Sequence, residues 1–239
     1  MKAFILAAGL GTRLKSLTKS KPKALVEAGG KTLLQINIER LSKSGITDIV
    51  INTHHFSNLI KDFLKQNNNF NLNIKISDET ELLLDTGGGI KKALSQFKSN
   101  EPVLIQNVDI YSDIDYTDML NSHLKNKSVA TLAINNRESS RYLLFNNSNY
   151  LSGWGNNQTN ERIITRNSDN LKKYAFCGIH IVSPDILDMM PDKKKFSIID
   201  AYLKISEDFK ISGYQYNGAW FDIGTPQKLN DFEIFLNKK

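Results

Sequence analysis

The first half of the chain alternates short apolar runs, rich in β-branched residues, with segments of helical pattern. This alternation is typical of a parallel sheet whose strands are joined by helices on its faces. We therefore predict an α/β fold with a doubly wound, mostly parallel sheet flanked by helices. Strands are expected at Ala3–Ala7, Asp48–Thr53, Asn73–Ser77, Val103–Val108 and Val129–Ile134.

Several predicted helices have recognisable ends. Thr32 and Gln35 form a capping box for a helix that Gly45 ends. Thr225 is the expected N-cap of the last helix, because proline follows at the first helical position. The other helices are predicted at Asn58–Gln66 with Ser57 as its cap, at Pro184–Met190 and at Ser197–Ser206, and the last one ends near Leu236.

The pattern changes after residue 135. Turn-rich polar segments at 146–149 and 155–157 separate short strands such as Tyr142–Phe145 and Arg162–Thr165. We interpret this region as a small β-rich lid and not as a separate domain. A strand over Phe176–Val182 then resumes the α/β pattern, so a single domain over residues 1–239 is expected.

The first predicted strand opens directly into a glycine turn, Gly9-Leu10-Gly11-Thr12-Arg13, and a second cation follows in Lys21-Pro22-Lys23. A strand that ends in a glycine loop between two cations suits the phosphates of a nucleotide, because glycine lets backbone amides approach the anion. The alternative is an ordinary loop with solvated charges. We expect the chain to handle a nucleoside triphosphate.

Two better-known glycine motifs do not fit. The dinucleotide fingerprint needs a third glycine where this chain has Leu14. A P-loop that ended at Gly30-Lys31-Thr32 would need a glycine at the position of Leu25. The sequence therefore favours neither a dehydrogenase nor a P-loop ATPase.

Two aspartates follow predicted strand ends. Asp109 comes directly after Val103–Val108, at the edge of the sheet where open α/β folds bind ligands, and Asp222 precedes the last helix. Either could simply cap a helix. Together with a phosphate loop they suggest a shared Mg²⁺, because this ion prefers carboxylates and substrate phosphates.

Composition limits the partners. The net charge is +6, but the basic residues are scattered, and Lys193-Lys194-Lys195 is expected to be a solvated turn. No basic stripe with interleaved aromatic residues is present, so we expect no nucleic-acid partner. The single cysteine excludes an intrachain disulfide, and no segment has the length of a membrane span or a signal-peptide core. We expect a cytoplasmic protein that binds small molecules and no membrane.

These motifs, taken in order, resemble the sugar-1-phosphate nucleotidyltransferases, also called NDP-sugar pyrophosphorylases. The matching residues are 6–14, Lys21-Pro22-Lys23, Thr86-Gly87-Gly88-Gly89, Asn107-Val108-Asp109 and Trp220–Thr225. The resemblance implies transfer of a nucleotidyl group from an NTP to a sugar 1-phosphate, with release of pyrophosphate. It also implies that residues 1–110 bind the nucleotide and residues 111–239 the sugar phosphate.

The resemblance assigns a role to each position. Arg13 would neutralise the leaving pyrophosphate, and Lys23 would stabilise charge at the α-phosphate. Mg²⁺ would be held by Asp109 and Asp222. The nucleotide would be bound by Ala8, Gly9, Leu10, Gly11, Thr12, Gly87 and Gly88, and the sugar by Asn107, Glu161, Phe176, Cys177 and Gly178.

One feature departs from many members of this family. The Glu-Lys-Pro segment that often supplies a lysine for the sugar phosphate has no clean match, and Glu161-Arg162 is a possible substitute. The resemblance leaves four candidate cations for the sugar phosphate, namely Arg162, Arg166, Lys172 and Lys173.

The short chain has no room for an appended acyltransferase or large regulatory region, so it resembles the short N-acetylmuramate 1-phosphate uridylyltransferases and the mannose- or heptose-1-phosphate guanylyltransferases. The segments 196–203 and 220–226 favour UTP and N-acetylmuramate 1-phosphate as substrates. The alternatives are a mannose- or heptose-1-phosphate guanylyltransferase, a glucose-1-phosphate thymidylyl- or uridylyltransferase, and a cytidylyl- or molybdenum-cofactor-type transferase. A non-catalytic nucleotide-binding module is the alternative of another class. We expect a monomer or a small homo-oligomer.

Overall fold

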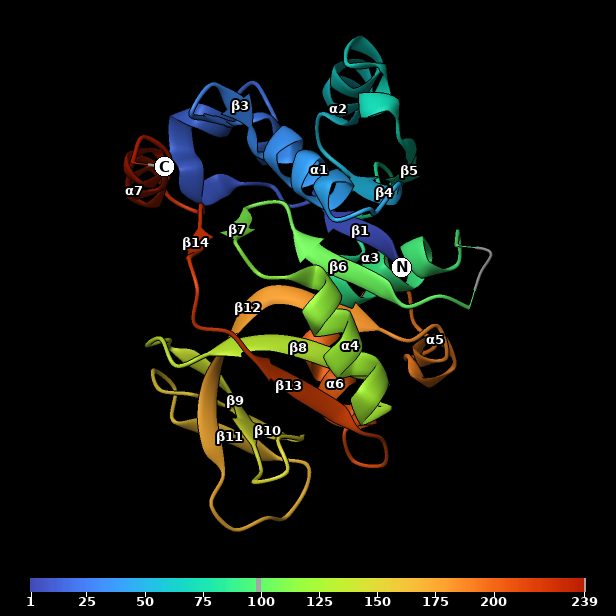
Figure 1. Cartoon of the computed structure of the whole chain (residues 1–239), viewed down its shortest axis with the longest axis vertical. Helices are drawn as coiled ribbons and strands as arrows, with labels where there is room; N and C mark the ends of the chain where they lie inside the picture. Colours follow the sequence, from blue (N-terminus) through green and yellow to red (C-terminus); the bar gives the residue numbers. More distant parts are fainter. Residues whose placement is uncertain (98–99, 239) are drawn as a thin grey trace.

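The computed structural model describes residues 1–97 and 100–238. Its main element is a ten-stranded sheet in the order β11-β10-β9-β12-β6-β1-β4-β5, in which β8 pairs with β12 and β13 pairs with β8 (Figure 1). The strands are β1 (Lys2–Leu6), β4 (Asp48–Thr53), β5 (Asn73–Asp78), β6 (Val103–Asn107), β8 (Ala130–Asn135), β9 (Arg141–Phe145), β10 (Leu151–Asn156), β11 (Glu161–Ile164), β12 (Lys172–Val182) and β13 (Ile211–Gln215).

The four strands β6, β1, β4 and β5 are all parallel, which confirms the parallel sheet predicted for the first half. Beyond β6 the sheet is mixed, because β12 runs antiparallel to β6. Since β1, β4 and β6 point the same way, the loops that follow them meet at one edge of the sheet.

Alternate residues of β1 face opposite layers of helices. Ala3 and Ile5 pack with α1 (Leu33–Lys43), α2 (Ser57–Gln66) and α4 (Tyr116–Asn126). Phe4 packs on the other face with α3 (Asp85–Leu94), α5 (Ile186–Met189) and α6 (Ile198–Ile205). The prediction of helices on both faces is therefore confirmed.

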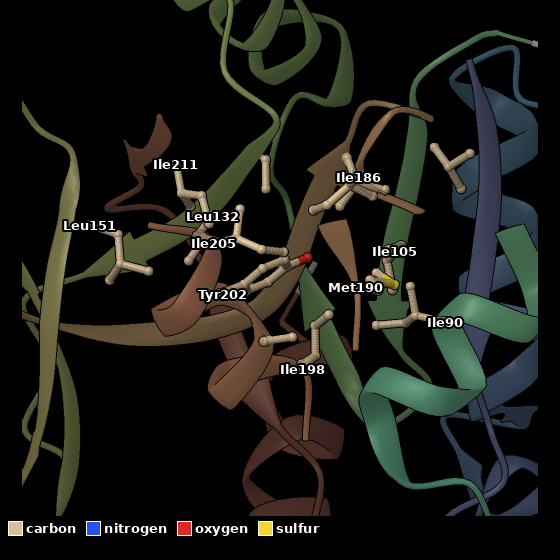
Figure 2. Close-up of a cluster of buried hydrophobic side chains, with 14 of the residues drawn as sticks. Ile90, Ile105, Leu132, Leu151, Ile186, Met190, Ile198, Tyr202, Ile205 and Ile211 are labelled. Carbon is tan, nitrogen blue, oxygen red and sulfur yellow. The ribbon is translucent and has the colours of Figure 1, made fainter. Parts of the chain in front are cut away.

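Figure 2 shows part of the second layer, with Tyr202 of α6 among apolar side chains from both halves of the chain. Ile90 of α3 and Leu132 of β8 belong to the same buried cluster. The two halves of the chain thus share their hydrophobic core. Among the described residues, no helix has the length and apolar content that crossing a bilayer requires.

The β-rich region between residues 141 and 164 consists of β9, β10 and β11, which pair antiparallel to one another and join the main sheet through the first residues of β12. Figure 1 shows these strands at the opposite end of the molecule from α1 and α2. The predicted turn at 155–157 is partly wrong, because Gly155 and Asn156 still belong to β10. Residues 141–164 are therefore an extension of the central sheet.

The caps follow the sequence only in part. The Thr32 side chain accepts a hydrogen bond from the Gln35 amide, but Gln35 Nε2 bonds Glu39, so only half of the capping box forms. The prediction of Ser57 as an N-cap is wrong, because it is the first helical residue and its hydroxyl lies 2.8 Å from that of Thr53. The final helix α7 (Pro226–Leu236) begins at its Thr225 cap as predicted.

Short elements complete the fold around the sheet edge. They are the 3₁₀ helices η1 (Thr12–Thr18), η2 (Lys23–Leu25) and η3 (Asn68–Asn71), and the strand pairs β2 (Glu27–Ala28) with β3 (Lys31–Thr32) and β7 (Ile110–Ser112) with β14 (Trp220–Asp222). The α7 helix packs its Leu229 and Phe232 against Leu14 and Ile223. This small cluster fixes the C-terminal segment beside the loop that follows β1.

Candidate active site

The loop after β1 forms one wall of a cavity of about 550 Å³ at the carboxyl edge of the parallel strands. Gly11 adopts a φ of 67°, and a Cβ there would lie 3.1 Å from Lys23 and from Thr18. Glycine is thus required by both conformation and space. The Thr18 hydroxyl donates to the Gly11 carbonyl at 3.0 Å and holds the loop. The loop residues that line the cavity are Ala7, Ala8, Gly9, Leu10, Gly11, Thr12 and Arg13.

Two buried polar residues, Asn52 and Glu79, hold the glycine loop in place by hydrogen bonds. Asn52, at the end of β4, accepts hydrogen bonds from the amides of Ala7 at 2.6 Å and Ala8 at 3.2 Å. Its Nδ2 donates to Glu79 at 2.7 Å, and the other oxygen of Glu79 accepts from the Leu84 amide at 3.0 Å. These two residues connect the phosphate loop to the segment that precedes α3.

The sequence analysis did not include Asn52 and Glu79, although it could have. Both follow the same rule that singled out Asp109, since each is polar and lies at the carboxyl end of a parallel strand. Their burial was not visible in the sequence, because it depends on how α3 packs against β4.

We predict that Asn52→Ala raises the KM for the nucleoside triphosphate and lowers the free energy of unfolding by about 1–3 kcal/mol. The substitution leaves two loop amides and the buried Glu79 carboxylate without their partner. Steady-state kinetics and chemical denaturation measure the two effects. Asn58→Ala, on the exposed start of α2, is the matched control. Unchanged KM and stability in Asn52→Ala would contradict the supporting role of this pair.

Lys23 and Asp109 form an ion pair in the floor of the cavity. Asp109 follows β6 directly, and Lys23 opens η2. The side chains are only 9% and 16% exposed, respectively. The alternative of a solvated surface charge is therefore wrong for Lys23. Lys23 is thus a mostly buried cation in the lining of the cavity.

Asp222 is brought beside Asp109 by the short ladder of β7 and β14. In this ladder Asp222 pairs with Ile110, and the Ile223 amide donates to the Asp109 carbonyl at 2.7 Å. The Asp222 carboxylate accepts from Lys228 Nζ at 2.6 Å. The two aspartates, more than a hundred residues apart in the sequence, thus lie on adjacent backbone segments.

The Arg13 guanidinium lies close to the Asp222 carboxylate, beside Gly224. A Cβ on Gly224 would lie 2.7 Å from Asp222 Oδ1 and 2.9 Å from the Arg13 guanidinium. Gly224 therefore leaves the space in which these two side chains approach each other. Arg13, Lys23, Asp109 and Gly224 all line the cavity of the phosphate loop.

The aspartates fit a hard cation in the nature of their donors, since both present carboxylate oxygens at the same edge of the sheet. Each carboxylate now has a lysine partner, Lys23 or Lys228. Among the described residues, no group of three or more metal-ligating side chains occurs. Two carboxylates would therefore bind Mg²⁺ together with substrate phosphates and would not form a closed protein site.

Gly87 and Gly88 were expected to bind the nucleotide, but other parts of the chain pack against both glycines. A Cβ on Gly87 would lie 2.4 Å from the Phe196 ring, and one on Gly88 would lie 2.0 Å from the Lys194 carbonyl oxygen. The Gly87 amide also donates to the Phe196 carbonyl at 2.9 Å. The space beside these glycines is thus filled by the chain itself and is not open to a base. The segment packed there carries Lys195, which lines the cavity.

We expect Gly88→Ala to lower the free energy of unfolding by about 1–3 kcal/mol, because its methyl group would lie 2.0 Å from the Lys194 carbonyl oxygen and would force the backbone there to shift. Gly9→Ala is the control, since a Cβ at Gly9 has nothing within 4 Å. Thermal unfolding of the two variants measures the difference. Equal stability of both variants would rule out the packing role of Gly88.

The residues expected at the sugar divide into two groups. Asn107 and Gly178 meet, because Gly178 has a φ of 72° and a Cβ there would lie 3.0 Å from Asn107 Nδ2. Phe176 is half-buried in the same bulged part of β12. The Cys177 side chain is fully buried, and burial raises the pKa of its thiol to about 12, so the expectation that it walls a pocket is wrong.

Glu161 is not near this cavity. It lies exposed on β11, the outermost strand, with β10, β9 and β12 between it and β6. Of the four cations suggested for the sugar phosphate, Arg166 donates to the carbonyls of Ser206 and Phe209. Lys173 lies over the Tyr142 ring at 4.4 Å. The remaining two, Arg162 and Lys172, are exposed on β11 and at the start of β12.

A larger depression of about 1410 Å³ lies on the other side of Glu79, between the segment that begins α2 and residues 192–194. It has neither the glycine loop nor the aspartates among its lining residues. The smaller cavity is therefore the candidate active site.

Comparison with known proteins identifies the family to which the chain belongs. The family model described as nucleotidyl transferase matches residues 2–239. The chain belongs to the nucleotidyl transferase family. The members of this family to which it is similar include the N-acetylmuramate alpha-1-phosphate uridylyltransferase of Caulobacter vibrioides, which is 31% identical over 94% of this chain and 92% of that relative.

A second family member, the mannose-1-phosphate guanyltransferase of Gibberella zeae, is 29% identical over 95% of this chain but over only 62% of its own length. Solved nucleotidyl transferase structures share the fold. UDP-glucose pyrophosphorylase in complex with UDP-glucose superposes with a TM-score of 0.77 at 19% identity, covering 100% of this chain and 99% of that one. HddC from Yersinia pseudotuberculosis, complexed with GMP-PN, gives 0.76 at 23% identity, covering 98% and 99%. The predicted fold class is confirmed.

Proposed function

We propose that this nucleotidyl transferase joins a nucleoside triphosphate to a sugar 1-phosphate, giving an NDP-sugar and pyrophosphate. The observation that carries the proposal is that Arg13, Lys23 and Asp109 line the cavity of the glycine loop. Asp222 lies next to Gly224, close to the Arg13 guanidinium. Both substrates are anions, so the reaction needs neutralised charge and aligned reactants more than it needs a nucleophile from the protein.

In the proposed reaction, an oxygen of the sugar phosphate attacks the α-phosphorus in line with the bond to the bridging oxygen of the β-phosphate. That bond breaks, and the pyrophosphate leaves with its electron pair. Lys23 stabilises the charge that develops at the α-phosphate, and Arg13, at the outer side of the cavity, binds the leaving pyrophosphate. The backbone amides around Leu10–Thr12 bind the triphosphate.

We further propose that Asp109 and Asp222 bind Mg²⁺. The ion, held by these two carboxylates, would neutralise negative charge on the substrate phosphates. Lys23 and Lys228 neutralise the two carboxylates in its place in this structure. The substrate phosphates and the metal therefore compete with these ion pairs when the reactants bind.

We propose UTP and N-acetylmuramate 1-phosphate as the substrates, acting in the cytoplasm. Two uridylyltransferases named for this sugar phosphate, from Caulobacter vibrioides and Neisseria meningitidis, match this chain over 92% and 96% of their own lengths. Two guanyltransferase relatives are each 29% identical to this chain, against 31% for the Caulobacter vibrioides enzyme. GTP with mannose or heptose 1-phosphate and UTP or dTTP with glucose 1-phosphate are the alternatives. A non-catalytic nucleotide-binding module is disfavoured, because Arg13, Lys23 and Asp109 line the cavity and Asp222 lies beside Gly224 at its border.

The experiment is pyrophosphate release in the presence of Mg²⁺, with UTP, GTP, dTTP and CTP each combined with N-acetylmuramate, mannose, glucose and N-acetylglucosamine 1-phosphate. We expect one strongly preferred pair, UTP with N-acetylmuramate 1-phosphate. Preference for another pair would keep the reaction class and change the substrate. Release by no pair from a folded protein that binds nucleotide would favour the non-catalytic module.

A further inference from the structure

A half-buried arginine that the sequence did not point to contacts the segment expected at the sugar. Arg137 follows the end of β8, and its guanidinium donates to the Phe176 carbonyl at 2.8 Å. It also lies over the Trp220 ring, 4.2 Å from the ring centroid. Trp220 begins β14, two residues before Asp222. Arg137 is thus fixed by the two segments that border the sugar side of the proposed site.

The contacts of Trp220 keep this arrangement rigid. Its Nε1 donates to the Cys177 carbonyl at 2.9 Å. Phe176 and Cys177 are the two residues before Gly178, whose missing side chain makes room for Asn107. Arg137, Trp220 and the backbone of 176–178 therefore form one unit between β6 and β14.

The charge of Arg137 has no direct counter-ion. Within the described ranges, no carboxylate lies within 4.0 Å of its guanidinium, and its Nε is buried without a hydrogen-bond partner. Burial lowers the pKa of the Arg137 guanidinium, while Cys177 and Asp222 act in the opposite direction. A half-buried arginine that lacks an anion is costly, and a bound anion would relieve that cost.

Next to the Trp220 ring, an arginine guanidinium is better suited than a lysine ammonium to bind a phosphate. Its planar fork can present two parallel N–H groups to a phosphate while its face stays stacked on an aromatic ring. The phosphate of a sugar 1-phosphate must approach the α-phosphate from the side of the aspartates opposite to the leaving pyrophosphate. Arg137 approaches Asp222 from β8, whereas Arg13 approaches it from the glycine loop.

We propose that Arg137 binds the phosphate of the sugar 1-phosphate and supplies the cation that the missing Glu-Lys-Pro lysine leaves open. The inference rests on the proposed function. It replaces the four earlier candidates. Arg162 and Lys172 are exposed on β11 and at the start of β12, Lys173 lies over the Tyr142 ring, and Arg166 is bound to backbone carbonyls. Trp220 then positions the guanidinium, and the Phe176 carbonyl fixes its orientation.

The test separates a substrate-binding role from a purely structural one. Arg137→Gln should raise the KM for N-acetylmuramate 1-phosphate by about 10- to 100-fold and leave the KM for UTP within about twofold. Arg137→Lys keeps the charge and should recover part of the loss. The matched control is Arg162→Gln, the same charge change on the exposed strand β11, which should alter neither KM.

A binding measurement that needs no turnover accompanies the kinetics. The chain has two tryptophans, so Trp154→Phe leaves Trp220 as the only indole emitter. Titration of this variant with inorganic phosphate and with N-acetylmuramate 1-phosphate should change its emission in a saturable way, and Arg137→Gln in the same background should lose the change. A wild-type protein that shows this response without turnover would contradict the proposed function and keep the inference.

Two results would overturn the inference. One is an Arg137→Gln variant that binds the sugar phosphate normally while its unfolding temperature falls, which would assign Arg137 to the support of β12 and β14 alone. The other is a KM increase for the sugar phosphate in Arg162→Gln and none in Arg137→Gln, which would return the role to β11.

Discussion

Replacement of Asp109 by asparagine is expected to lower kcat by at least about 1000-fold while the protein stays folded. The substitution keeps the shape of the side chain but removes the charge that faces Lys23 and that would bind the metal. The Asp109 backbone also stays in place, because its carbonyl accepts from the Ile223 amide at 2.7 Å whatever the side chain is. Pyrophosphate release and thermal unfolding measure the two parts of this prediction.

Asp62→Asn, the same chemical change on the exposed face of α2, is the control and should be fully active. The dependence of the rate on Mg²⁺ concentration adds a second readout. The half-saturating Mg²⁺ concentration of any residual activity should increase in Asp109→Asn. Near-normal turnover in this variant would remove Asp109 from the proposed metal site.

Lys23→Ala should lower kcat by about 100- to 1000-fold and also destabilise the protein by about 1–3 kcal/mol. The sequence alone suggested an exposed lysine with little influence on folding, but the side chain is only 9% exposed and pairs with Asp109. Removal of the lysine leaves a mostly buried carboxylate without its partner. Pyrophosphate release and chemical denaturation test the two effects.

Lys21→Ala is the matched control, because Lys21 is two residues away, has a side chain that is 37% exposed and lies 4.0 Å from Glu27. A surface pair of this kind contributes little, so we expect a change below about 0.5 kcal/mol. The double variant Lys23→Ala/Asp109→Asn should be more stable than Lys23→Ala, because it no longer leaves a charge unpaired. Additive losses would mean that the two side chains do not interact.

The parallel half of the sheet could be predicted because its strands carry their own pattern. The Asp48–Thr53 strand has the observed bounds, and Val103–Val108 differs by one residue. Elements without a local signal were missed. The α3 helix contains Gly87-Gly88-Gly89, which disfavours a helix, and it forms because those glycines let Phe196 and Lys194 pack closely.

The glycines of β10 also disfavour the structure that is observed. Its Gly153 and Gly155 favour a turn in the sequence, but in the structure the positions that their side chains would take are filled by the Ile163 backbone and the Tyr142 ring. Local propensity gave the wrong answer there because a tertiary contact decides the conformation.

Some residues of the candidate site could be predicted from the sequence and others could not. Arg13, Lys23, Asp109 and Asp222 belong to contiguous motifs, and their association could be predicted from strand ends and from the family resemblance. Asn52 and Glu79 lie at strand ends, the same signal that marked Asp109, but their burial depends on contacts between strands such as the Asn52–Glu79 hydrogen bond. Arg137 contributes through the Phe176 carbonyl, 39 positions away, so no local pattern marked it. Glu161 had the expected residue type next to a cation, but β11 places it at the outer edge of the sheet.

We propose that the nucleotidyl group of a nucleoside triphosphate is transferred to a sugar 1-phosphate in the cavity of the glycine loop. The most direct test incubates the protein and Mg²⁺ with α-³²P-labelled UTP and N-acetylmuramate 1-phosphate, followed by separation of the products. We predict a labelled nucleotide sugar and an equal amount of unlabelled pyrophosphate, both absent with Asp109→Asn. A folded, nucleotide-binding protein that yields no labelled nucleotide sugar with any of the NTP and sugar 1-phosphate pairs, each NTP α-labelled, would contradict the account.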